Sequence, residues 1–243
     1  MLSKAPIAEA VIEFRFSPDS SLDFSALKKM GDTITDKFPL KEEKALKEMK
    51  WHFSKKEPLP QLKDLGPVML ILSSTEKNRV VQLRTDRYAF SSVGPYSTWN
   101  EFSTEAMNVW QRFDIGERIN SFSRVGVRYI NNLNLPKDRN YLERYLSRPP
   151  KIPENVSGGI EGFLNRVIIK NSEIPASSTI ALALDHNKIS EESLPVILDI
   201  DVFYSDFMEY NEGMILDVLE KLRNFKNDIF FNSLTEEGIG LYK

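Results

Sequence analysis

Hydrophobic and polar residues alternate over residues 8–16. Successive side chains of a strand point to opposite faces, so this period of two predicts a half-buried β-strand. Apolar residues then recur at helical spacing from Phe24 to Phe38, and Asp23 is placed to cap the N-terminus of that helix. The apolar face of the strand consists of Ala8, Ala10, Ile12, Phe14 and Phe16.

The rest of the first half predicts three further strands and a helix. Residues 41–50 carry many charges of both signs and indicate a solvated face or loop. The strands are expected at residues 46–53, 68–72 and 80–90. Thr98 followed by Glu101 matches a capping box, which opens an aromatic helix that ends near Phe113. The predicted order is β-α-β-β-β-α.

The second half repeats this order after a connector at residues 114–120. Residues 124–135 alternate between apolar and polar and predict a strand. Prolines and glycines make residues 148–159 a loop. The remaining elements are a short helix at 140–146, strands at 163–169, 180–185 and 196–204, a helix at 212–225, and a short capped turn at 233–237.

Two stretches of the chain resemble copies of one another. Val81–Asp86 and Val196–Asp201 are both strand-like, and each leads into an amphipathic helix. A repeat of this length predicts an α+β fold built by tandem duplication of a β-α-β-β-β-α unit, with a pseudo-two-fold axis. Short turns between strands favour largely antiparallel sheets packed with helices. The expected units are residues 1–118 and 119–243, which form one compact structure.

Composition narrows the class of protein. The 243 residues carry a net charge of −3, which argues against a general nucleic-acid binder, since such proteins neutralise many phosphates with Lys and Arg. The chain has no cysteine, so disulfides and thiolate metal sites are excluded. It shows no signal-peptide pattern and no apolar run of membrane-spanning length. We therefore expect a soluble, cytoplasmic protein without a membrane partner.

Four charges on the two opening strands are the main candidate site. The repeat aligns Arg124 with Glu9 and Arg128 with Glu13. In one interpretation these residues form ion pairs where the strands meet near the pseudo-axis. In the other, Arg124 and Arg128 straddle Gly126 and line a pocket for a phosphate or carboxylate.

Other candidate residues have plainer interpretations. Tyr129 and Tyr204 lie in strands, where their hydroxyls could reach a pocket mouth. Asp199 and Asp201, aligned with Arg84 and Asp86, are weak candidates for a metal site completed by Asp185 or Glu209, and we interpret them as ordinary strand carboxylates. The remaining candidates are Trp99, Trp110 and Phe113, expected in the core, and His52 and His186, expected to be ordinary polar residues.

Three segments resemble a sporadically distributed family of uncharacterised prokaryotic proteins. They are the Pro-Ile-x-Glu-Ala opening at residues 6–16, the Arg-Tyr-x-Asn block at 128–131, and the ending at 227–235. The resemblance implies a bacterial or archaeal stand-alone protein and places Glu9, Glu13, Arg128 and Tyr129 in the family pattern. It implies no activity.

No catalytic motif is present in the sequence, so the leading hypothesis is a non-enzymatic binding or adaptor protein. Its site would include Arg124, Arg128, Tyr129, Glu9 and Glu13. Its partner would be a small anionic ligand, another protein or a second copy of the chain, with no cofactor. The alternatives are an enzyme acting on a phosphorylated or nucleic-acid substrate through Asp199, Asp201 and an arginine, or a component of a prokaryotic defence or toxin–antitoxin system.

Overall fold

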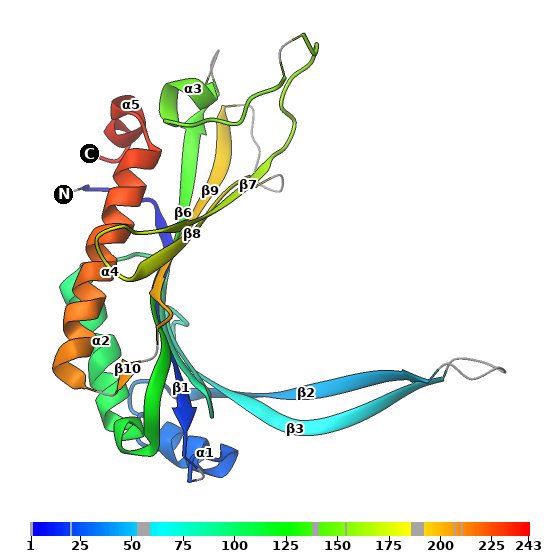
Figure 1. Cartoon of the computed structure of the whole chain (residues 1–243), viewed down its shortest axis with the longest axis vertical. Helices are drawn as coiled ribbons and strands as arrows, with labels where there is room; N and C mark the ends of the chain where they lie inside the picture. Colours follow the sequence, from blue (N-terminus) through cyan, green and yellow to red (C-terminus); the bar gives the residue numbers. More distant parts are fainter. Residues whose placement is uncertain are drawn as a thin grey trace.

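The computed structural model is an α+β protein built on one large antiparallel sheet (Figure 1). It describes residues 2–19, 21–52, 59–137, 141–153, 155–185, 192–206, 208–209 and 211–243. The first half contains β1 (Ile7–Pro18), α1 (Phe24–Asp32), β2 (Leu40–His52), β3 (Leu59–Ser73), β4 (Arg79–Arg84), β5 (Arg87–Val93) and α2 (Trp99–Arg112). The second half contains β6 (Ile119–Pro136), α3 (Tyr141–Tyr145), β7 (Leu164–Lys170), β8 (Ala176–Leu184), β9 (Ser193–Tyr204), β10 (Met208–Glu209), α4 (Glu212–Ser233) and α5 (Glu236–Gly240), and a 3₁₀ turn at Ile115–Arg118 precedes it.

The strand order is β2-β3-β4-β5-β1-β6-β9-β8-β7, and β10 pairs with β6. The two opening strands, β1 and β6, lie side by side at the centre, where Ile12 is opposite Val127. β2 and β7 are the two edges. A single sheet therefore runs through both halves of the chain.

The helices α2, α4 and α5 lie along one face of this sheet (Figure 1). The inward residues of the central strands alternate, as the sequence predicts, so Ile12, Phe14, Val127 and Tyr129 are fully or almost fully buried beneath them. The β2–β3 hairpin projects away from the helical layer on the other side (Figure 1). We call this second side the helix-free face.

An aromatic cluster anchors α2 to the central strands. The Phe14 ring lies edge-on to Trp110, with centroids 5.0 Å apart, and stacks on Tyr88 at 5.7 Å. The Tyr88 hydroxyl donates to the Ala106 carbonyl at 2.6 Å, which satisfies a polar group inside the core. Trp99, Trp110 and Phe113 are at most 8% exposed, so their predicted place in the core is confirmed.

Helix starts follow the capping signals in the sequence. The Asp23 carboxylate accepts from the Ala26 amide at 2.7 Å, and the Thr98 hydroxyl accepts from the Glu101 amide at 3.2 Å. The final capped turn is also present, since Thr235 caps α5. Helix ends are less well predicted: α1 stops at Asp32 instead of Phe38, and α4 continues beyond Phe225 to Ser233. None of the helices in these ranges is both long and apolar enough to cross a membrane.

The predicted β-α-β-β-β-α order is wrong in the first half. The expected strand at residues 80–90 is two strands, β4 and β5, joined by a tight turn at Thr85 and Asp86. The charged tract at residues 41–50 is part of edge strand β2 and not a loop. Its charges suit an edge, where alternating ionic side chains discourage pairing with other chains: Glu43 pairs with Lys28 at 2.7 Å, and Lys41 pairs with Asp32.

Candidate functional site

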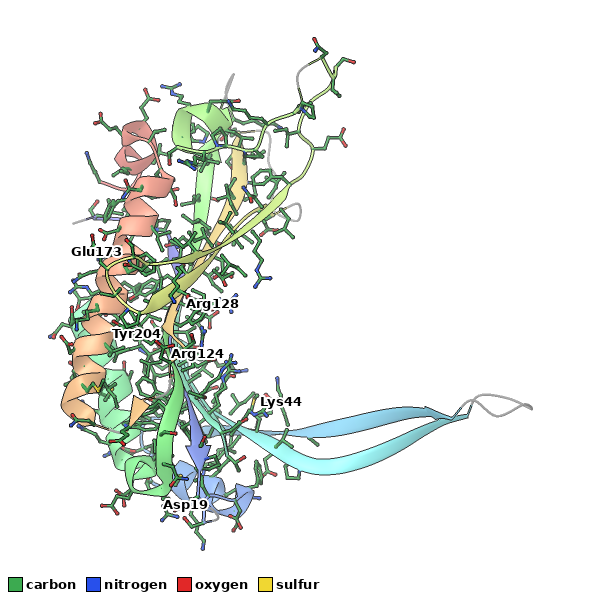
Figure 2. The ribbon with its side chains drawn as sticks, viewed as in Figure 1. Asp19, Lys44, Arg124, Arg128, Glu173 and Tyr204 are labelled. Carbon is green, nitrogen blue, oxygen red and sulfur yellow. The ribbon has the colours of Figure 1, made fainter. Side chains whose placement is uncertain are left out.

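The candidate charges gather at the centre of the helix-free face. In antiparallel strands, residues directly opposite one another project to the same side of the sheet. Glu13 on β1 is opposite Ala89 on β5 and Gly126 on β6, and Arg128 on β6 is opposite Asp201 on β9. Four neighbouring strands therefore contribute to one polar surface, on which Figure 2 labels Arg124 and Arg128.

Glu13 is the centre of this surface. Its Oε1 accepts from Arg15 Nε at 2.7 Å and from Arg124 Nε at 3.0 Å, and its Oε2 pairs with Arg87. The Glu13 side chain is only 11% exposed. A carboxylate this buried needs its charge and lone pairs matched, and three guanidinium groups do so here.

Arg124 joins Glu13 to the second half of the sheet. Its Nη2 donates to Asp201 Oδ1 at 2.6 Å, and its guanidinium carbon lies 3.8 Å from the centroid of the Phe203 ring. A Cβ on Gly126 would lie 3.2 Å from Arg124 Nη2. Gly126 therefore makes room for the Arg124 guanidinium, whereas the sequence suggested room for a ligand. Burial raises the pKa of Asp201, although Arg124 opposes this shift.

Arg128 forms a separate and more exposed pair. Its Nε and Nη2 donate to the two carboxylate oxygens of Asp199 at 2.9 and 2.6 Å, the two-pronged geometry typical of arginine. The Arg128 side chain is 48% exposed. The hydrogen bonds that Arg128 donates to Asp199 raise the pKa of Arg128, and the negative charge of Glu9 adds to this effect. We call Glu13, Arg15, Arg87, Arg124, Asp201 and this pair the arginine network.

A polar hollow of about 200 Å³ lies over the arginine network. Four arginines and three carboxylates line it, namely Arg15, Arg87, Arg124, Arg128, Glu9, Glu13 and Asp201. Gln82 and Ser91 add neutral polar groups. The Nε of Arg87 is buried and has no hydrogen-bond partner among the residues that the structure describes. A hollow lined by more arginines than carboxylates, one of which has an unmet donor, suits a small anionic group.

The predicted contact between the opening strands is present as the Glu13–Arg124 ion pair. The structure does not bring Tyr129 to the arginines, because it points to the opposite face and is 1% exposed. Tyr204 is also buried, at 7% exposure. Sequence reasoning missed Arg15 and Arg87, although Arg15 follows the same alternation as Glu13. Arg87 had no such signal, since its position depends on the pairing of β5 with β1.

Asp199 and Asp201 point to the arginines as ordinary paired carboxylates. Each accepts from a different arginine. Within the part of the chain that the structure describes, no three His, Asp or Glu residues are grouped to hold a metal ion. The structure does not describe His186 or the side chain of His52.

Tyr129 belongs to a second cluster between β6 and the helices. Its hydroxyl is 2.7 Å from that of Tyr96, and Lys226 Nζ on α4 lies 3.9 Å from the centroid of its ring. Burial raises the pKa values of both tyrosines. Lys226 is 8% exposed, and its Nζ donates to Asn227 Oδ1 at 2.6 Å. Burial, assisted by the nearby Arg223, lowers the pKa of Lys226 to about 8.

We expect Lys226→Met to stabilise the protein at neutral pH. The pKa of Lys226 is lower in the folded than in the unfolded state, so the folded protein binds this proton more weakly. The ionised lysine therefore opposes folding below about pH 8, and this penalty disappears as the pH rises towards the pKa of the unfolded state. The cation–π contact with Tyr129 offsets part of it, leaving a gain of about 1–3 kcal/mol in unfolding free energy. Denaturant unfolding at pH 7 and pH 10 measures this gain, which should shrink at the higher pH. A gain that is absent at pH 7, or that grows towards pH 10, would contradict the prediction.

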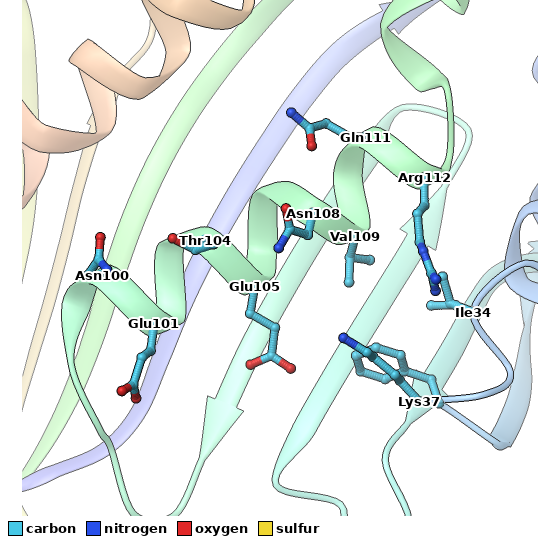
Figure 3. Close-up of a pocket in the computed structure, with 11 residues that line it drawn as sticks. Ile34, Lys37, Asn100, Glu101, Thr104, Glu105, Asn108, Val109, Gln111 and Arg112 are labelled. Atoms are coloured by element: carbon cyan, nitrogen blue, oxygen red, sulfur yellow. The ribbon is translucent and has the colours of Figure 1, made fainter.

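A larger groove, of about 810 Å³, lies on the helical layer between α2 and the turn that follows α1 (Figure 3). It is lined by Asn100, Thr104 and Asn108 of α2, and by Lys37 across from them. Two charged lining residues are already paired: Glu105 accepts from Arg79 at 2.8 Å and Arg112 donates to Asp36 at 3.2 Å. Within the described part of the chain, no buried polar atom of a residue that lines the groove lacks a partner, so the arginine network is the stronger candidate.

The comparisons with known proteins add no assignment: no protein-family model matches the chain, and no curated protein matches it.

Proposed function

We propose that the protein is a non-enzymatic binding protein that holds an anionic group of a small ligand or partner protein in the hollow over the arginine network. The observation that carries this proposal is the buried Nε of Arg87, which has no partner in the described ranges although its own guanidinium pairs with a carboxylate that two further arginines share. Arg15 and Arg128, which are about half exposed, supply further guanidinium edges at the rim. A phosphate or carboxylate is the group that fits such planar donors.

The pairing of the carboxylates supports binding over catalysis. An enzyme that uses Asp199 and Asp201 needs at least one of them as a base or a metal ligand. Both accept short hydrogen bonds from arginines, at 2.6 Å in each case. A carboxylate oxygen that already accepts a bond from a guanidinium has less capacity left to coordinate a metal ion or to accept a substrate proton. This favours the binding protein over the alternative of an enzyme acting on a phosphorylated or nucleic-acid substrate.

We also infer that the scaffold is a tandem duplication with a pseudo-two-fold axis between β1 and β6. Outward from β1 the strands are β5, β4 and β3, and outward from β6 they are β9, β8 and β7. The pair Ile12–Val127 is flanked by Val11–Arg128 and Glu13–Gly126. A two-fold axis through the Ile12–Val127 pair makes Arg128 the equivalent of Glu13. The sequence alignment of the two opening strands gives the same equivalence. About this axis β9 is equivalent to β5. Arg84 ends β4 and Asp199 lies within β9, so the alignment of these two residues is wrong.

The resemblance of residues 6–16, 128–131 and 227–235 to a prokaryotic family remains a prediction. It fits the proposal in one respect. Three of the four residues that it marks, Glu9, Glu13 and Arg128, line the hollow, whereas Tyr129 supports the central strand from the opposite side.

We expect inorganic phosphate to bind the hollow and Arg87→Gln to weaken this binding about tenfold, because one charge-assisted hydrogen bond is worth roughly 1.5 kcal/mol or more. Phosphate should shift the NMR signals of the Nε–H groups of Arg15, Arg87 and Arg128. Acetate, titrated in the same way, distinguishes a preference for phosphate from one for carboxylate. Glu13 keeps two of its arginines in the variant, so the fold should survive.

Arg112→Gln is the matched control for this experiment. It makes the same chemical change on the helical layer, at a side chain that is 49% exposed and paired with Asp36. We expect phosphate binding to be unchanged in this variant. Equal loss in both variants, or no shift of the arginine signals with either anion, would rule out the proposed site.

A further inference from the structure

Strand β7 is an open edge of the sheet. It pairs with β8 on one side and has no strand on the other among the described residues. Six of its seven residues are exposed, and three of these are large aliphatics, with exposures of 75% for Leu164, 45% for Val167 and 65% for Ile168. Proteins usually protect an edge of this kind, since its free backbone N–H and C=O groups can pair with another chain.

The register shows which side chains of β7 share the helix-free face. Arg166 is opposite Ala181 on β8, and Ala181 is opposite Asp199 on β9. Asp199 belongs to the arginine network, so Arg166 lies on the same face of the sheet. By the alternation of the strand, Leu164, Ile168 and Lys170 lie there too. Aliphatic and basic residues therefore alternate along this face of the edge.

The charge of β7 is entirely positive. Between residues 164 and 170 there are two cations, Arg166 and Lys170, and no acid. Neither cation forms an ion pair with a described residue. These charges disfavour pairing of β7 with the β7 strand of a second copy of the chain. If two copies paired in antiparallel fashion about Val167, each Arg166 would have the cations Arg166 and Lys170 of the other copy as diagonal neighbours.

We propose that β7 is a docking edge for an extended, acidic segment of a partner protein, which adds an antiparallel strand to the sheet. Carboxylates of this segment lie opposite Arg166 and Lys170, and aliphatic side chains lie opposite Leu164 and Ile168. Backbone hydrogen bonds supply affinity, and the charges select the sequence. This docking edge is separate from the hollow over the arginine network and does not depend on the function proposed for it.

The peptide Glu-Thr-Val-Val-Glu-Thr-Val has this pattern, and its counterpart with lysine in place of both glutamates has the opposite charge. We expect the acidic peptide to bind about tenfold tighter or more, because two cross-strand pairs change from repulsion to attraction. Fluorescence anisotropy of labelled peptides measures the affinities. Hydrogen exchange should show new protection of the β7 amides when the acidic peptide binds.

Reversing the two charges tests the assignment without threatening the core, because both side chains are exposed. Arg166→Glu/Lys170→Glu should reverse the preference, so that the basic peptide binds tighter. Lys4→Glu/Lys151→Glu makes the same change in net charge at exposed residues elsewhere, and it should keep the preference for the acidic peptide. Absence of binding, equal affinity for the two peptides, or peptide protection outside β7 would overturn the proposal. So would a concentration-dependent dimer that protects β7 without peptide.

Discussion

Replacing Arg124 by leucine is expected to lower the free energy of unfolding by about 3–5 kcal/mol, because it leaves two partly buried carboxylates without their shared partner. Glu13 is 11% exposed and Asp201 is 26% exposed. Glu13 keeps Arg15 and Arg87, but the structure gives Asp201 no ion pair except that with Arg124 among the described residues. Denaturant unfolding at pH 7 measures the loss.

Arg128→Leu is the matched control, with the same substitution on the same strand. The Arg128 side chain is 48% exposed and that of Arg124 only 14%, although Asp199, at 22%, is about as buried as Asp201. Loss of this half-exposed pair should therefore cost less than Arg124→Leu, on the order of 1–2 kcal/mol. The burial of the two guanidinium groups therefore assigns the larger effect to Arg124 and not to Arg128. Similar losses in the two variants would show that burial does not set the cost.

Replacing Asp201 by asparagine in the Arg124→Leu variant tests whether the unpaired charge causes the loss of stability. In Arg124→Leu/Asp201→Asn the uncompensated charge is removed while the shape of the side chain is kept. We expect this double variant to regain part of the stability that Arg124→Leu loses, because a neutral amide costs less to bury than an unpaired carboxylate. A double variant less stable than Arg124→Leu would show that the loss comes from packing on Phe203.

The second large effect is expected for Gly238→Ala. A Cβ at this position would lie 2.3 Å from the backbone oxygen of Tyr145, a contact that requires α5 and α3 to move apart. The same junction is held by the Thr235 amide, which donates to the Tyr145 carbonyl at 3.1 Å. Overpacking typically costs 1–3 kcal/mol, and a backbone contact has little room to relax, so we expect a loss of about 3 kcal/mol.

Gly240→Ala is the control for this substitution, because it lies in the same helix with nothing within 4 Å of an added Cβ. It should be neutral or stabilise by up to about 1 kcal/mol, the difference in helix propensity. Thermal unfolding measures both variants, and hydrogen exchange at Thr235 and Ser147 reports whether α5 leaves α3. A stable Gly238→Ala with unchanged exchange would contradict the packing at this junction.

Local patterns in the sequence predicted the elements of this fold well where short-range interactions define them. Alternation gave β1 and β6, and the caps at Asp23 and Thr98 are formed within three residues of the chain. The β4–β5 turn was missed because alternation continues on both sides of it and because Thr85 and Asp86 carry no glycine signal. Alternation also assigned Tyr129 to the apolar face, so its proposal as a ligand residue beside Arg124 conflicted with the pattern itself.

The sequence by itself determined which residues of each strand share a face, because that depends only on a period of two within one segment. It therefore predicted that Glu13 and Arg124 would be available to pair. Only the tertiary structure decided that Arg87 completes the network and that Arg124, not Arg128, is buried. The physical reason is that ion pairs between strands depend on strand order and register. Both are set by packing between segments far apart in the chain, which no local pattern specifies.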